Sequence, residues 1–272
     1  MQLSISGTAR ALRAAMVVLL GLSAVIGTGV PSGLAAGRPL VAAASDLQFA
    51  LAEIRSLFAA ATGEDIKLSF GSSGNFATQI RSGAPVELFL SADETYIAAL
   101  AHDGLTEGEG ALYAEGRVVI FVPQGSPLKA DGSLEDLKTA LAEGRVGKFA
   151  IANPDHAPYG KRAKEALVHK DLWNAIESKL VMGENISQAA QFALSGAAQG
   201  GIIAYSLALS PDVGGRGTFA LIPAEWHQPL RQRMVLVKGA GSVARQFYDF
   251  VRGSESRTIL KHYGFVLPGE AQ

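Results

Sequence analysis

The strongest constraint on the fold is a repeating pattern between residues 38 and 104, where short apolar runs alternate with helical segments. "RPLVAAASDL" and "VELFLSAD" read as buried strands, and "DIKLSF" alternates apolar and polar residues with the period of a strand. A helical pattern follows each of them, and the helices are expected to end at Gly63, Gly83 and Gly104. This β-α-β-α-β-α order is typical of a parallel, doubly wound α/β sheet.

A second series of the same kind follows the apolar strand "GRVVIFVP" at residues 116–123. Further strands are predicted in "KFAIANP", "GGIIAYSLAL", "GTFALIP" and "QRMVLVKG". Helices are predicted in "SLEDLKTALAEG" with Ser133 as N-cap, in a long segment beginning near Tyr159, and in "SQAAQFALSGAAQ". Two series joined by one strand predict two lobes. Because ligands of open α/β sheets bind beyond the carboxyl ends of the strands, a cleft between the lobes is expected.

The first 36 residues have the pattern of a secretory signal peptide. Arg10 and Arg13 precede an apolar run from residue 14 to about 26, and small residues ending in "GLAA" follow. The alternative is a membrane anchor, but a spanning helix needs about 20 apolar residues and this run is shorter. We therefore expect residues 1–36 to be cleaved and the mature protein to be periplasmic.

The composition of the remaining chain indicates a globular protein without a polyelectrolyte partner. Hydrophobic residues make up 48% and charged residues 18% of the whole sequence. Removing the leader removes two arginines and no acidic residue, which leaves a slight acidic excess and no pattern for nucleic acid. The chain has no cysteine, so thiol chemistry, thiolate metal sites and disulfides are excluded.

Small and hydroxyl residues stand where the predicted strands pass into helices. The stretches are "AAASDL", "FGSSGN", "ANPDHAPYG" and "MGENIS". Free N–H groups and the helix dipole at such positions favour anions, and Ser45 and Ser73 could add hydroxyl donors. Each turn alone could be an ordinary N-cap, but four of them in one βα chain favour an anion site.

The segments "VAAASDL", "FGSSGNFATQIRSGAPVELFLSAD", "NPDHAPYGKRAKEAL" and "KHYGFVLP" resemble the periplasmic molybdate-binding proteins of ABC transporters. The resemblance covers about residues 38 to 268. It implies the bilobed α/β fold of periplasmic binding proteins, each lobe a mostly parallel sheet flanked by helices. Lobe 1 would comprise residues 38–117 plus 223–268, and lobe 2 residues 118–222. The implied function is binding of molybdate, and of the nearly isosteric tungstate, for delivery to a membrane permease.

The resemblance also implies a set of site residues. Family members hold the oxyanion with hydroxyl and backbone N–H groups, without a direct metal ligand or a cation. The matching positions are the hydroxyls of Ser45 and Ser73 and the backbone N–H groups of Tyr159 and Ile186. A monomer without cofactor, nucleic acid or catalytic activity is implied as well.

Three further residues, Tyr205, Asp46 and Ser72, are expected near the site in less direct roles. Some family members use an additional tyrosine, but here the matching position is Ala204 and Tyr205 comes one residue later, where a strand would turn it away from the cleft. The Tyr159 hydroxyl is a possible replacement. Asp46 near the anion would cost about 3 kcal/mol, so its side chain is expected to bond N–H groups of its own helix. Ser72 would cap or shape its turn.

Other functions receive less support from the sequence. The same fold could bind sulfate or a small organic acid, although an organic acid usually calls for an arginine partner. A serine hydrolase would need the motif G-x-S-x-G, which "GSSGN" lacks, and His156 is expected to be a surface turn residue. No His or Cys spacing indicates a metal site, and "GSSGNF" lacks the full dinucleotide fingerprint.

Overall fold

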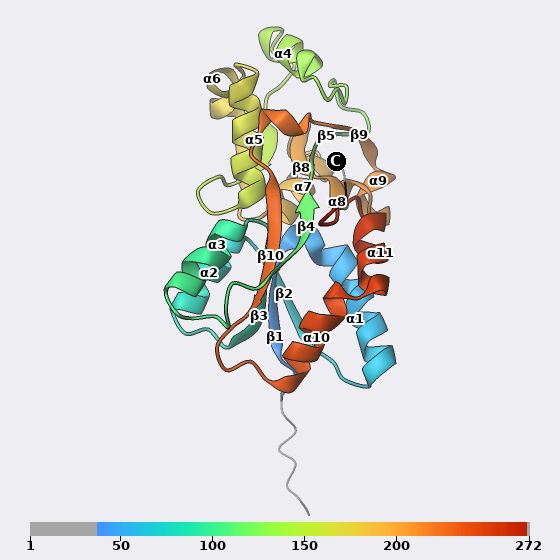
Figure 1. Ribbon diagram of the computed structural model, residues 1–272. Helices are drawn as coiled ribbons and strands as arrows, with labels where there is room; N and C mark the ends of the chain where they lie inside the picture. The colour runs from blue at the N-terminus through green and yellow to red at the C-terminus, as the bar shows by residue number, and fades with distance from the viewer. Residues whose placement is uncertain (1–36, 271–272) are drawn as a thin grey trace, which may run out of the picture. The chain divides into compact units, whose positions relative to one another are not determined.

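The computed structural model describes residues 37–270, and two five-stranded sheets form their framework (Figure 1). The β1 sheet has the strand order β2-β1-β3-β10-β4, with β1 at Leu40–Ala44, β2 at Lys67–Gly71, β3 at Val86–Ser91, β4 at Ala111–Gly116 and β10 at Leu230–Leu236. The β5 sheet has the order β7-β6-β8-β5-β9, with β5 at Val118–Pro123, β6 at Phe149–Ala152, β7 at Leu180–Gly183, β8 at Gly201–Ala204 and β9 at Gly217–Leu221. The predicted signal peptide lies outside the described residues.

Both sheets are mixed, which corrects the prediction of mostly parallel sheets. In the β1 sheet, β1 runs parallel to β2 and β3, whereas β10 is antiparallel to β3 and β4. In the β5 sheet, β6 is parallel to β7 and β8, whereas β5 is antiparallel to β8 and β9. The antiparallel pairs occur where the chain passes from one sheet to the other. It does so between Gly116 and Val118 and again between Leu221 and Leu230.

Eleven α-helices lie within residues 37–270: α1 (Gln48–Thr62), α2 (Ser73–Arg81), α3 (Glu94–His102), α4 (Glu135–Ala142), α5 (Pro158–His169), α6 (Trp173–Ile176), α7 (Ile186–Leu194), α8 (Tyr205–Ala208), α9 (Pro211–Gly214), α10 (Ser242–Arg252) and α11 (Ser254–His262). None of them is both long and apolar enough to cross a membrane.

Helices cover both faces of the β1 sheet, as the alternating pattern predicts. Figure 1 shows α2 and α3 on one side of the sheet and α1, α10 and α11 on the other. The apolar spacing of α1 buries Leu51, Ile54 and Phe58, and Phe58 meets Phe247 of α10 edge to face at 5.1 Å. Burying each such side chain contributes about 1.5–3 kcal/mol. Gly63 ends α1 with φ +73°, the left-handed conformation that the sequence predicts for its C-cap.

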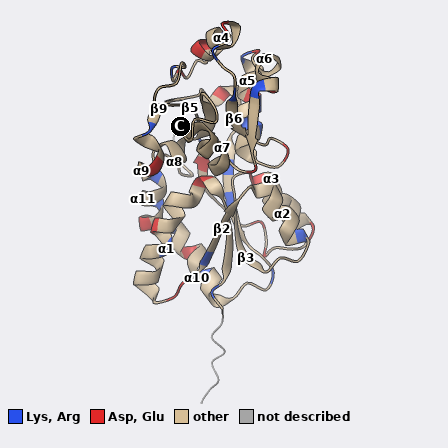
Figure 2. Cartoon of the chain, turned by 180° about the vertical axis from the view of Figure 1, so that it is seen from behind, with Lys and Arg blue, Asp and Glu red and all other residues tan. Residues whose placement is uncertain are grey.

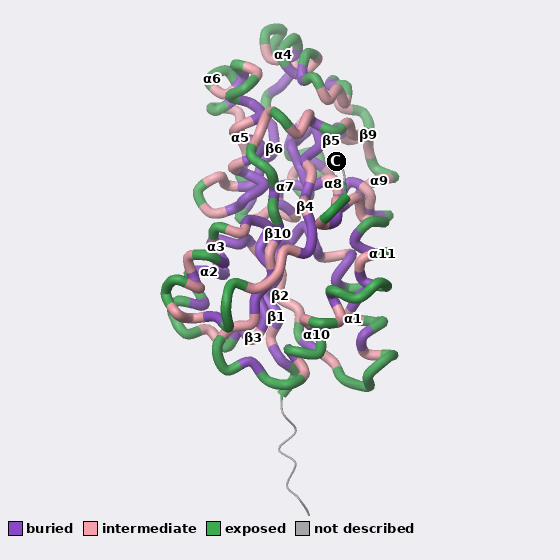
Figure 3. Tube along the Cα trace, viewed as in Figure 1, coloured by how far each residue is buried: buried purple, intermediate pink, exposed green. Residues whose placement is uncertain are grey.

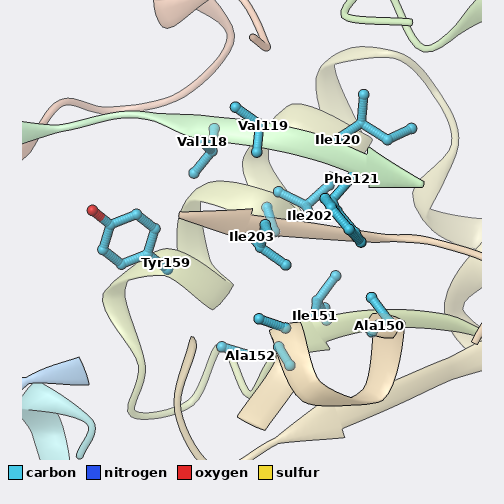
Figure 4. Packing of buried hydrophobic residues seen from close by; sticks show 14 of the residues in the cluster. Val118, Val119, Ile120, Phe121, Ala150, Ile151, Ala152, Tyr159, Ile202 and Ile203 are labelled. Carbon is cyan, nitrogen blue, oxygen red and sulfur yellow. The ribbon is translucent and has the colours of Figure 1, made fainter. Parts of the chain in front are cut away.

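The β5 sheet holds the larger hydrophobic core. Its inner strands β5, β6 and β8 are buried, whereas the edge strands β7 and β9 are largely not (Figure 3). The labelled aliphatic side chains of β5, β6 and β8 pack together in Figure 4, and Tyr159 stands at their margin. Its hydroxyl points away from these apolar groups. The start of α5 therefore carries a polar atom from the core margin towards the other sheet.

Local sequence patterns missed or misplaced several elements. The strand β4 was not predicted, and the four-residue strand β7 was predicted as the end of a helix; both are only partly buried. The apolar run "GGIIAYSLAL" is a strand only up to Ala204 and then turns into α8. Ser133 is not the N-cap of α4, because the Asp131 carboxylate accepts hydrogen bonds from the N–H groups of Glu135 and Asp136 instead.

Candidate anion-binding site

A small cavity of about 10 Å³ lies between residues from the two sheets. The turns after β1, β2 and β3 contribute from one side, and the starts of α5 and α7 contribute from the other. The lining residues are Ala44, Ser45, Asp46, Gly71, Ser72, Ser73, Ala92, Ala157, Pro158, Tyr159 and Ile186. The four residues predicted to bind the ligand all lie here, as do Asp46 and Ser72.

Helix starts surround this cavity. The helices α2, α5 and α7 begin at Ser73, Pro158 and Ile186, and the 3-10 helix η1 begins at Ser45 and leads into α1. The N–H groups of a first helical turn have no partner within their own helix, and the helix dipole makes that end partly positive. Their convergence on one cavity creates an environment for a negative charge.

The lining contains no side chain that could neutralise an anion by its charge. Within residues 37–270, no Lys, Arg or His lines this cavity. Figure 2 shows Lys and Arg interspersed with Asp and Glu over the outer helices of both sheets. An anion would therefore be held by neutral donors, which recognise the position and number of its oxygens.

A wider groove along the edge strand β2 is a weaker candidate. It includes Arg38, Arg55 and Lys67 in its lining. Asp65 forms ion pairs with Arg38 at 3.1 Å and with Arg55 at 2.7 Å. The single carboxylate offsets only part of the positive charge, but the residues that line the groove include none of the helix starts that surround the smaller cavity.

The hydroxyl of Ser73 is oriented by the chain that follows β3. The N–H of Ala92 donates to Ser73 Oγ at 3.0 Å, and both residues are buried. With one lone pair of the oxygen engaged, the hydroxyl hydrogen is left to donate to another acceptor. Ser73 thus offers a donor at the cavity wall.

The hydroxyl of Ser45 joins the two sides of the cavity. Ser45 Oγ donates to Asn185 Oδ1 at 3.1 Å and accepts from the N–H of Ser187 at 3.2 Å. Asn185 also caps α7 by accepting from the N–H of Gln188. A ligand that takes the hydroxyl hydrogen of Ser45 must therefore compete with Asn185.

Ser72 and His156 form a second contact across the cavity rim. Ser72 caps α2 by accepting from the N–H of Asn75 at 3.4 Å, and its Oγ lies 2.9 Å from His156 Nδ1. His156 lies in a turn, as predicted, but its side chain is only 21% exposed. The third group of a catalytic triad is poorly placed: Glu184 is 3.5 Å from His156 Nε2 and its side chain is 69% exposed.

Asp46 forms a buried polar cluster with two residues from distant elements. Asp46 Oδ2 accepts from the Tyr159 hydroxyl at 2.9 Å and from Gln232 Nε2 at 2.6 Å. The Asp46 side chain was expected to bond N–H groups of its own helix; the backbone contact it makes there is with the N–H of Asp46 itself, and its side-chain partners come from α5 and β10. Burial raises the pKa of Asp46 to about 6, and the hydrogen bonds from Gln232 and Tyr159 lower it less than burial raises it.

Tyr205 lies away from the cavity, as expected, but for a different reason. Its predecessor Ala204 ends β8, and Tyr205 begins α8 rather than continuing the strand. Its ring lies 5.9 Å from that of Phe219 and packs beside Gly264 near the C-terminus. Tyr205 therefore has a packing role here.

Sequence reasoning missed Gln232, and a signal for it exists. In β10 the inward positions are Leu230, Gln232 and Met234, and the arginines between them face outward. A polar residue at the buried phase of an alternating strand requires a polar partner. Metal binding has no comparable signal, since residues 37–270 contain no group of three or more His, Cys, Asp or Glu that could hold an ion.

Two mixed sheets joined by two crossings, with a cavity at the helix starts between them, define the class of two-lobed binding proteins. The chain matches the family described as "Bacterial extracellular solute-binding protein" over residues 39–266 and therefore belongs to that family. The molybdate-binding protein ModA of Rhodobacter capsulatus is 36% identical over 248 residues, which cover 90% of this chain and 94% of that protein. ModA of Azotobacter vinelandii is 34% identical over 230 residues, covering 84% and 89%.

Solved structures give the same result for the fold. The periplasmic molybdate-binding protein of Azotobacter vinelandii matches with a TM-score of 0.76 at 29% identity, covering 85% of this chain and 100% of that chain. The sulfate-binding protein SubI of Mycobacterium tuberculosis matches with a TM-score of 0.70 at 17% identity, covering 85% and 87%. The second likeness concerns the fold alone.

Proposed function

We propose that this protein binds molybdate in the periplasm and delivers it to the membrane component of an ABC importer. The observation that carries the proposal is the cavity lined by serines and helix starts, in a chain whose relatives are molybdate-binding proteins. Binding rather than catalysis is the proposed activity, with the protein acting as a monomer and without a cofactor. Residues 1–36 are proposed to be the signal peptide that directs export.

The groups proposed to bind the anion are the hydroxyls of Ser45 and Ser73 and the backbone N–H groups of Tyr159 and Ile186. All four belong to the cavity lining, and they come from four different helix starts. Hydrogen bonds to a charged acceptor are about twice as strong as those between neutral groups. Four such donors can hold a dianion without a cation in the site.

Closure of two lobes is the proposed route of capture. The proposed boundaries, residues 38–117 plus 223–268 for lobe 1 and 118–222 for lobe 2, lie close to the two crossings between the sheets. Hinge motion at such crossings brings the walls of a cleft together around a ligand. The contacts of Ser45 and Ser72 across the cavity support this proposal, since they join the two proposed lobes.

Selectivity among tetrahedral oxyanions would follow from the radius of the cavity. Molybdate and tungstate are nearly equal in size, so we propose that both bind. Sulfate is smaller and would leave buried donors unpaired, at about 1–3 kcal/mol each. Another oxyanion on the same fold remains the second candidate, because the fold alone does not determine the ligand.

A thermal shift experiment tests the proposed ligand directly. A ligand at 100 times its Kd stabilises by about 2.7 kcal/mol, which corresponds to roughly 5–10 °C for a domain of this size. We expect this shift with molybdate and tungstate but not with equal concentrations of sulfate or phosphate. A shift with sulfate alone would contradict the molybdate proposal and support the second candidate. The double variant Ser45→Ala/Ser73→Ala should lose the response, and the exposed Ser56→Ala should keep it.

A further inference from the structure

One oxygen of the Asp46 carboxyl group has no partner. The residue is 1% exposed and lines the cavity, and its Oδ1 is buried without a hydrogen-bond partner among the described residues. Its other oxygen, Oδ2, accepts two hydrogen bonds. An unsatisfied carboxyl oxygen is unfavourable in a buried site unless a ligand or a proton satisfies it.

A chain of hydrogen bonds determines which oxygen can carry a proton. The Tyr113 hydroxyl donates to Gln232 Oε1 at 2.7 Å, which directs the amide group of Gln232 towards Asp46. Gln232 Nε2 then donates to Asp46 Oδ2 and, at 3.2 Å, to the oxygen of Tyr159. Because Tyr159 in turn donates its hydrogen to Oδ2, this oxygen is only an acceptor. A proton on Asp46 therefore belongs on Oδ1.

The surroundings of Asp46 contain no charge that would keep it ionised. The titratable groups facing it are Tyr159 from α5 and Tyr113 from β4, both neutral because burial raises their pKa well above the ordinary value. Gln232 from β10 and Ser206 from α8, which donates to the Asp46 carbonyl oxygen, carry no charge. Within residues 37–270, no Lys, Arg or His side chain forms an ion pair or a hydrogen bond with Asp46.

We propose that Asp46 is a neutral carboxylic acid in the complex and donates its Oδ1–H to the bound oxyanion, so that binding at neutral pH takes up one proton. The inference rests on the proposed function and adds one hydrogen-bond donor to the proposed site. The proton comes from solvent and forms a bond to Oδ1, and no other covalent bond changes. An ionised Asp46 would repel the dianion, whereas the neutral acid supplies a fifth donor.

The proposal gives affinity a defined pH dependence. Burial places the pKa of Asp46 at about 6 in the ligand-free protein, and an adjacent anion raises the pKa further in the complex. Affinity is therefore full below pH 6 and weakens as the pH rises through and above that value. Raising the pH from 7 to 8 should raise the Kd for molybdate by about tenfold.

Calorimetric titration with molybdate at pH 7.5, in buffers of different ionisation enthalpy, measures the proton uptake on the intact protein. We expect about one proton per bound anion. Uptake below about half a proton, with molybdate bound, overturns the inference. No binding of molybdate at any pH instead overturns the proposed function, so the two failures are distinguishable.

The variant Asp46→Asn tests whether Asp46 is the residue that takes up the proton when molybdate binds. Its amide oxygen can accept from Tyr159 and Gln232, and its NH₂ group can donate at the position of Oδ1. We expect this variant to bind molybdate with no proton uptake and with a Kd that is constant between pH 6 and 8. The matched control Asp249→Asn changes a carboxylate that is 75% exposed on α10 and should behave as the parent does. Persistent uptake in Asp46→Asn would overturn the assignment.

Discussion

The backbone N–H of Gly74 donates to the carbonyl oxygen of His156 at 3.0 Å and joins the first turn of α2 to the turn that precedes α5. A Cβ at Gly74 would lie 2.6 Å from that oxygen and 3.0 Å from His156 Cα. Both atoms belong to the backbone, so neither can rotate aside. Close approach of the two sides of the cavity thus requires glycine here.

We expect Gly74→Ala to weaken molybdate binding by hindering closure. Overpacking costs about 1–3 kcal/mol, and here it acts only when the two sides meet, so the Kd should rise about 5- to 150-fold. Calorimetric titration measures this change. The control Gly215→Ala adds a methyl group where no atom lies within 4 Å. Equal affinity in Gly74→Ala and the parent would show that closure does not determine binding.

The Ser45 hydroxyl should be a main determinant of affinity. We expect Ser45→Ala to raise the Kd for molybdate about 10- to 150-fold, because a hydrogen bond to a charged group contributes about 1.5–3 kcal/mol. The exposed Ser56→Ala, which loses only a bond to the Ala52 carbonyl oxygen, is the matched control. Unchanged affinity in Ser45→Ala would show that the Ser45 hydroxyl does not bind the anion.

The sequence predicts the cavity wall well because the relevant signals are local. Ser45 and Ser73 follow their strands directly, and a hydroxyl residue at a strand-to-helix turn is visible in a few adjacent letters. Gly63 is predictable for the same reason, since a helix C-cap needs a residue that tolerates positive φ.

The polar cluster around Asp46 has no such local signal. Asp46 and Gln232 are 186 residues apart in the chain, and their contact depends on β10 crossing back into the β1 sheet. The same crossing makes the sheet mixed, which the pattern of alternating strands and helices did not predict. Side-chain direction at Asp46 is thus a property of the topology, whereas the position of Ser73 is a property of one turn.

A buried ion pair across the two sides should contribute strongly to stability. Arg162 on α5 contacts Asp93 Oδ2 at 3.0 Å, and each side chain is 9% exposed. We expect Asp93→Asn to lower the free energy of unfolding by about 1.5–3 kcal/mol, because the buried guanidinium group loses one of its two carboxylate partners and keeps only Glu165, at 2.6 Å. The Asn side chain can still cap α3. Urea denaturation measures the loss.

The exposed pair of Arg81 and Asp103 provides the comparison for this prediction. Its side chains are 41% and 39% exposed, so Asp103→Asn should lower the free energy of unfolding much less than Asp93→Asn does. Similar losses in Asp93→Asn and Asp103→Asn would mean that burial does not strengthen the contact of Asp93.

Asp46 should make the stability of the ligand-free protein depend on pH. Its pKa rises from 3.8 to about 6 on folding, so the folded protein binds this proton more tightly than the unfolded chain does. The associated stability is fully present below about pH 4 and is lost as the pH rises through 6. A difference of about 2 pKa units corresponds to roughly 3 kcal/mol.

Comparison of the parent with Asp46→Asn isolates this contribution, because all other titrating groups cancel. Urea denaturation in buffer free of oxyanions should show the variant gaining up to roughly 3 kcal/mol relative to the parent between pH 4 and pH 8. Asn keeps the two hydrogen bonds from Tyr159 and Gln232, so the gain would come from the removed charge alone. A stability difference that stays constant within about 0.5 kcal/mol over this range would mean that folding does not raise the pKa of Asp46.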